Sequence, residues 1–97
     1  MVSLTRPQMA LLRLTVADGC CTHFAPAHHH SAWVVRASGG VRTFAQGTGD
    51  ALLSLGFLAP DPDPIFAVVY AGHFTIRRYV VTPAGLKQAA AHVARRR

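Results

Sequence analysis

A chain of 97 residues, of which 51% are hydrophobic and 14% are charged, has the composition of one small folded domain and excludes a disordered chain or a second core. Ten Lys and Arg stand against four acidic residues, all of them Asp, and the formal net charge of +6 favours an anionic partner such as nucleic acid. Three of these charges belong to the terminal Arg95, Arg96 and Arg97. They have a second interpretation, because cations at a helix C-terminus complement the helix dipole and keep an apolar protein soluble.

The sequence carries no signal for export or membrane insertion. The amino end lacks a charged segment followed by an apolar one, and no run reaches the roughly 18 apolar residues of a membrane span. Cys20 and Cys21 are adjacent, so a disulfide between them would be strained and reduced thiols are expected. We therefore expect a cytoplasmic protein with no membrane contact.

The first helix is predicted to begin at Thr5, because Thr5 and Gln8 form a capping box and Leu4 and Met9 flank it as a hydrophobic staple. Asp18-Gly19 ends this helix after about three turns. Residues 20–31 show neither helical nor strand periodicity and contain Pro26 and three consecutive histidines, so they are predicted to be a loop or an irregular edge segment.

A hairpin is predicted next. Residues 32–37 are rich in β-branched and aromatic side chains, Ser38-Gly39-Gly40 forms the turn, and a second strand covers residues 41–44. A short helix follows over residues 51–55, with cap candidates among residues 46–50 and Gly56 at its C-terminus.

The second half is predicted to hold a longer hairpin and a final helix. Residues 59–64, with three prolines, form an extended connector that cannot enter the centre of a sheet. Strands over 65–70 and 74–81 surround Ala71-Gly72-His73. Thr82 caps the last helix, Pro83 occupies its first position, and Val81 is placed to contact Leu86.

The order of a short helix, Leu55-Gly56-Phe57-Leu58, a hairpin and Tyr79-Val80-Val81-Thr82-Pro83-Ala84-Gly85 before a final helix resembles the winged-helix family of small bacterial and phage regulators, over roughly residues 43–94. The resemblance implies a single α+β winged-helix-like domain over residues 1–97, with a basic tail at 95–97. The expected elements are a helix, a hairpin, a short helix, a wing hairpin and a C-terminal helix. It further implies a regulator of transcription that binds double-stranded DNA.

The helix that would enter the major groove departs from this family, because its only polar groups are Thr48, Asp50 and Ser54. DNA contacts are therefore expected from the hairpins, the wing and the tail. Consecutive Arg77 and Arg78 point to opposite faces of their strand, so one of them at most faces a given partner. The alternative is that these cations are a solvated surface. The predicted DNA-binding residues are Arg36, Arg42, Thr43, Gln46, Thr48, Arg77, Arg78, Arg95, Arg96 and Arg97.

The competing prediction is a protein-interaction module, or an inhibitor or accessory protein encoded by a phage or plasmid, on the same scaffold. Its interface would be the apolar wing face with Phe66, Val68, Tyr70 and Phe74. Small residues in the last helix, Ala89, Ala90 and Ala91 with Val93, suit close packing against a second copy or against the chain's own domain. A homodimer through this helix is one expectation.

The soft ligands of the chain lie between residues 20 and 30, and they are Cys20, Cys21, His23, His28, His29 and His30. Their number suffices for zinc, but adjacent ligands converge poorly and no standard finger has this spacing. We predict no metal or other cofactor and a polar loop that becomes cationic below about pH 6.5. The chain has no Glu and no G-x-S-x-G turn. A nucleophilic Cys21 activated by His23 or His28 has only sequence proximity in its favour, so no enzyme is expected.

The predicted core combines apolar residues from every element. Its members are Leu11, Leu12, Val16, Trp33, Val35, Leu52, Leu55, Phe57, Ile76, Val80, Leu86 and Val93.

Overall fold

The computed structural model describes residues 2–26, 30–63, 69–71 and 74–95 and shows a small α+β domain. Every strand pair is antiparallel, and the strands form one sheet in the order β3-β2-β1-β6-β4, with β5 also paired to β6. The elements are α1 (Arg6–Asp18), β1 (Cys21–Pro26), β2 (Ala32–Ala37), β3 (Gly40–Ala45), α2 (Gln46–Ser54), β4 (Leu58–Pro60), β5 (Val69–Ala71), β6 (Phe74–Val81) and α3 (Pro83–Arg95).

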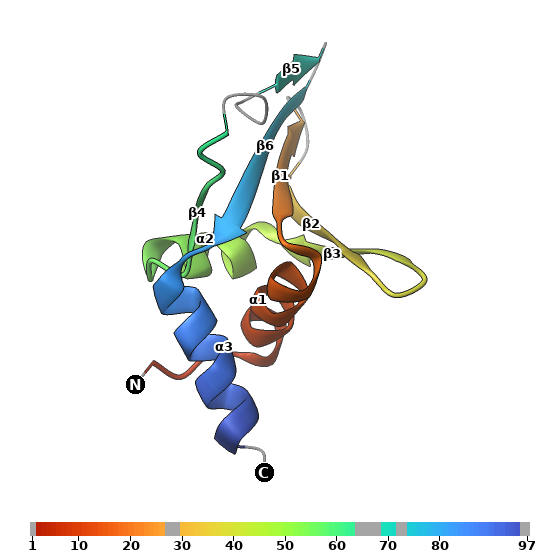
Figure 1. The fold of residues 1–97 in the computed structure, drawn as a ribbon. Coiled ribbons are helices and arrows are strands. Elements are labelled where there is room, and N and C mark those ends of the chain that lie inside the picture. The colour runs from red at the N-terminus through yellow and green to blue at the C-terminus, as the bar shows by residue number, and fades with distance from the viewer. Residues whose placement is uncertain (1, 27–29, 64–68, 72–73, 96–97) are drawn as a thin grey trace.

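The three helices gather toward one end of the long strands β1 and β6, and β5 lies at the opposite end (Figure 1). α1 packs against β2 and β6, and α2 packs against α1 and the β2–β3 hairpin. Among the described helices, none is long and apolar enough to cross a membrane.

The predicted capping of α1 is confirmed. The Thr5 hydroxyl accepts from the Gln8 amide at 3.3 Å, and the Gln8 side chain accepts from the Thr5 amide at 3.0 Å. At the other end Gly19 adopts a left-handed conformation with φ of 95°, and its N–H donates to the Thr15 carbonyl. The sequence signals therefore place both ends of this helix.

The predicted loop over residues 20–31 is wrong, because Cys21–Pro26 forms β1 at the centre of the sheet. β1 pairs with β2 on one side and with β6 on the other. Side chains of β1 alternate between the two faces of the sheet, since Cys21 and His23 face the helices and Thr22 and Phe24 face away. This alternation is not visible as a pattern of hydrophobic and polar residues, because the inward positions hold Cys and His. Cross-strand neighbours stabilise this strand in place of intrinsic propensity.

The two hairpins agree with the sequence in most of their length. β2 and β6 have the predicted bounds, and β3 is extended by one residue at each end. β4 and β5 pair with successive parts of one edge of β6, so the predicted connector contributes an edge strand that ends at Pro60. Residues 65–68 of the predicted strand lie outside the described residues.

α2 begins at Gln46, five residues before the predicted start, and no cap side chain bonds to its first turn. Its end follows the prediction. Gly56 has φ of 79°, and the amides of Gly56 and Phe57 donate to the carbonyls of Leu53 and Leu52. These two bonds form a Schellman motif, which turns the chain into β4.

The junction between β6 and α3 packs against this turn. The Thr82 hydroxyl accepts from the Gly85 amide at 3.1 Å, as predicted for an N-cap, and donates to the Gly56 carbonyl. The Thr82 amide donates to the Phe57 carbonyl at 3.0 Å. A Cβ atom on Gly85 would overlap that carbonyl oxygen, so glycine is required for the close approach of α3.

Half of the predicted core is confirmed, namely Leu11, Leu12, Trp33, Val35, Leu52 and Phe57. Three predictions are wrong, because Val16, Leu55 and Leu86 are 39%, 42% and 50% exposed. Thr15 takes the inward position of α1, and small Gly85 and Ala89 take that of α3. The remaining predicted members are Ile76 and Val80, which are half-buried, and Val93, whose side chain lies outside the described part. The prediction missed Met9, Cys21, Phe44, Leu58, Tyr79 and Ala89.

Candidate functional site

The predicted DNA-binding residues of the sheet divide between its two faces. Strand register aligns Thr43, Val34, Thr22 and Arg78 in one cross-strand row, which faces away from the core. Arg42 and Arg77 belong to the face that carries Trp33 and the helices. The opposite orientation of Arg77 and Arg78 is as predicted, and no single flat partner contacts all of these residues.

Two of the predicted arginines are paired with aspartates. Arg36 Nε lies 3.5 Å from an oxygen of Asp18, and Arg78 Nε lies 3.4 Å from an oxygen of Asp61. Such pairs reduce the positive potential that a phosphate would meet. Arg36 and Arg78 are therefore weaker phosphate ligands than their sequence positions indicate.

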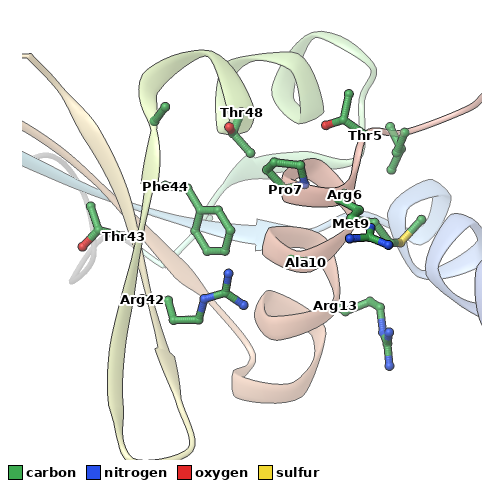
Figure 2. Close-up of a pocket in the computed structure, with 12 residues that line it drawn as sticks. Thr5, Arg6, Pro7, Met9, Ala10, Arg13, Arg42, Thr43, Phe44 and Thr48 are labelled. Atoms are coloured by element: carbon green, nitrogen blue, oxygen red, sulfur yellow. The ribbon is translucent and has the colours of Figure 1, made fainter.

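A groove of about 730 Å³ lies between α1 and the edge strand β3, and α2 closes one end of it (Figure 2). We call it the α1–β3 groove. It exists because α1 packs over β2, so β3 projects beyond the helix. Its lining residues are Leu4, Thr5, Arg6, Pro7, Met9, Ala10, Arg13, Arg42, Thr43, Phe44, Ala45 and Thr48.

The base of the α1–β3 groove is apolar. Met9 and Phe44 are each 6% exposed and belong to the core, and Leu4 and Ala10 pack against it. Hydroxyl groups come from Thr5, which caps α1, and from Thr48, whereas the Thr43 side chain points to the other face of β3 (Figure 2). An apolar base beneath polar and charged groups is the usual composition of a ligand site.

Three arginines are among the lining residues. Arg6 and Arg13 come from α1, and Arg42 extends from β3 toward α1 with its guanidinium 4.9 Å from the centre of the Phe44 ring (Figure 2). None of the four aspartates is among the lining residues, and within the described residues no carboxylate is paired with these arginines. The groove is thus a concentrated and uncompensated positive site.

The sequence prediction included Arg42, Thr43 and Thr48 of this site and missed Arg6 and Arg13. A signal was available. Arg6, Ala10 and Arg13 follow the spacing of four and three residues that places side chains on one helix face. The apolar positions of α1 alone do not reveal this arginine-bearing face of the helix.

Gln46 belongs to a separate polar network around Trp33. The Trp33 indole N–H donates to the Gln46 carbonyl at 3.1 Å and to Asp50 at 3.3 Å, and the Gln46 side chain donates to Asp50 at 2.9 Å. His23 lies 3.2 Å from the Gln46 side-chain oxygen, and its ring packs on Trp33 at 4.8 Å. These groups bind one another, so Gln46 and Asp50 are occupied in positioning α2.

The Cys and His residues do not form a metal site among the described residues, in which no three potential ligands come together. His28 and His29 lie outside them. Burial raises the pKa of the Cys21 thiol to about 11, a hydrogen bond with Thr15 opposes this and Cys20 adds to it. Because only a thiolate is strongly nucleophilic, Cys21 is chemically inert at neutral pH.

Several predicted contacts fall wholly or partly outside the described residues. These are the arginine tail with the side chain of Arg95, and Phe66 and Val68 of the alternative interface. Tyr70 and Phe74 of that interface lie in β5 and β6, beside Thr75 and Ala71. Ala89 packs in the chain's own core and Ala90 is exposed, so the predicted dimer surface is only partly free.

No protein-family model, curated protein or solved structure matches this chain. The class of the protein therefore rests on its own architecture, a small α+β domain with three helices and one antiparallel sheet.

Proposed function

We propose that the protein is a DNA-binding regulator that holds DNA phosphates in the α1–β3 groove. The observation that carries this proposal is that Arg6, Arg13 and Arg42 all line one groove to which no aspartate contributes. Phosphate oxygens accept charge-assisted hydrogen bonds from guanidinium groups, often two at a time. Three such groups around one cavity suit a polyanion.

The distribution of the acidic residues supports the same site. Asp18 and Asp61 are paired with Arg36 and Arg78, and Asp50 accepts from Trp33 and Gln46. Three of the four aspartates are thus engaged away from the groove, and Asp63 is not among the groove's lining residues. An approaching phosphate meets attraction there without a compensating repulsion.

In this proposal the protein contacts the DNA backbone and not the base edges of a duplex. α2 offers Thr48 to the groove, while its Gln46 and Asp50 bond to each other and to Trp33. Phosphate contacts fix the position of a protein on DNA but read little sequence. A winged-helix type of regulator is supported by the order of the elements, although a strand, and not a helix, directly precedes α2.

The test is a titration of a labelled duplex, followed by fluorescence anisotropy at several salt concentrations. The variant combines Arg6→Ala, Arg13→Ala and Arg42→Ala, and its expected salt slope is lower by about three because each phosphate contact contributes about 0.9. The control combines Arg36→Ala, Arg77→Ala and Lys87→Ala, which removes the same charge from elsewhere. It should retain most of the slope.

Loss of binding by the control but not by the groove variant would place DNA elsewhere on the domain. Absence of binding by the wild-type protein at low salt would refute the proposal. The alternative function, a protein-interaction module on the same scaffold, would then take its place.

A further inference from the structure

We propose that the α1–β3 groove accepts an unpaired DNA strand and holds one base between the Arg42 guanidinium and α1. This inference rests on the proposed DNA-binding function and narrows it to the form of DNA that fits the groove best. Duplex DNA would still bind through its phosphates, but more weakly.

The shape and chemistry of the groove suit an unpaired base. Its volume of about 730 Å³ lies in the range of pockets that enclose small molecules. Its base consists of Met9, Ala10 and Phe44. A duplex presents charged phosphates on a convex surface and keeps the faces of its bases stacked inside, so nothing in it matches an apolar hollow. An unpaired strand exposes those faces.

Arg42 is oriented so that a base can stack on it. This exposed side chain extends from β3 toward α1, with its guanidinium 4.9 Å from the centre of the Phe44 ring (Figure 2). The contact with Phe44 preorganises a planar, delocalised cation at the wall of the groove. Bases stack on such a plane as they do on aromatic rings.

α1 presents two arginines and a small residue to the groove. Arg6 and Arg13 are separated by two helical turns, or about 10 Å along the axis. Between them on the same face lies Ala10, whose small side chain leaves room in the groove. The two arginines can therefore hold the phosphates on either side of a base that enters over Ala10.

The experiment compares three labelled ligands at one salt concentration: a DNA strand of about twelve nucleotides, its duplex, and an abasic strand of the same length. We expect the unpaired strand to bind about tenfold more tightly than the other two, because one stacked base contributes about this factor. Electrostatics alone predicts the reverse order for strand and duplex, because a single strand has the lower charge density. The preference is therefore diagnostic of base contact.

Two variants locate the base. Arg42→Lys keeps the charge but removes the stacking plane, so the preference for the unpaired strand over the abasic strand should disappear. Its matched control, Arg13→Lys, should retain that preference. Ala10→Leu fills the groove without changing charge and should abolish the preference while duplex binding persists. Circular dichroism of each variant verifies that the fold is intact.

Equal affinity for the strand and the abasic strand would overturn this inference and leave the proposed DNA binding in place. Equal affinity for poly-glutamate would also overturn it, because the groove would then recognise charge alone and suit an acidic protein segment. Absence of binding to any of the DNA ligands at low salt would overturn the proposed function together with this inference.

Discussion

The two sides of α1 differ in how their polar groups are satisfied. On the core side Leu11, Leu12 and Thr15 are fully buried, and the Thr15 hydroxyl donates to the Leu11 carbonyl at 2.7 Å. On the groove side Arg6, Arg13 and Arg42 line one groove with an apolar base, and none of the lining residues is a carboxylate. Like charges brought together without counter-charges cost stability. An arrangement of this kind is expected where a ligand supplies what the chain does not.

The polar network around Trp33 shows most clearly how polar groups near the core are hydrogen-bonded within the domain. The indole is 1% exposed, and its N–H has two acceptors within α2. Its ring packs on Tyr79 at 4.8 Å and covers the backbone of Gly49. Because these contacts are made within the domain, substitutions at this site should affect stability more than binding.

The largest effect is expected for Gly49→Ala, since its new methyl group would overlap the Trp33 indole. Overpacking of this kind costs about 2 to 3 kcal/mol, measured as the free energy of unfolding in urea. Gly47→Ala in the same helix is the matched control, because no described atom lies within 4 Å of its Cβ position. It should gain up to about 1 kcal/mol from helix propensity. Equal effects of both substitutions would contradict the close packing of Trp33 on α2.

The second-largest effect is a loss of folding stability at high pH that comes from Cys21. Its pKa is raised from 9.0 to about 11 in the folded state, so the native protein holds a proton that the unfolded chain releases. The resulting stabilisation is complete below about pH 9 and is lost as the pH rises toward 11. Its size is roughly 2 to 3 kcal/mol for a shift of this magnitude.

Urea unfolding between pH 8 and 11 measures this effect when the wild-type protein is compared with Cys21→Ala. The stability difference between them should shrink as the pH rises, because titrations common to both proteins cancel. Cys20→Ala should follow the wild-type curve. Parallel curves for the wild-type protein and Cys21→Ala would show that the thiol is not desolvated.

Local signals predicted both ends of α1, the start of α3, the β2–β3 hairpin and β6, but not the start of α2, because capping and turn residues act through neighbours in sequence and α2 has no capping side chain. β1 was not predictable in this way. Its pairing with β6 joins Cys21 to Tyr79 across more than half of the chain, and long-range pairing leaves no local trace. The candidate site shares this property. Arg42 could be named from sequence, but its meeting with Arg6 and Arg13 depends on how far β3 projects beyond α1.

The smallest effect on stability is expected for the combined Arg6→Ala, Arg13→Ala and Arg42→Ala variant. This variant tests directly whether the groove side of α1 serves binding and the core side serves stability. Relief of repulsion among the three cations offsets the loss of the contact between Arg42 and Phe44, so the free energy of unfolding should change by less than about 1 kcal/mol. Addition of DNA should raise the melting temperature of the wild-type protein and leave that of the variant unchanged, because only a ligand of the native state shifts unfolding. A loss of several kcal/mol without DNA would show instead that the arginines support the fold. Both sides of α1 would then contribute to folding stability, and reduced DNA binding by the variant could not be assigned to the groove.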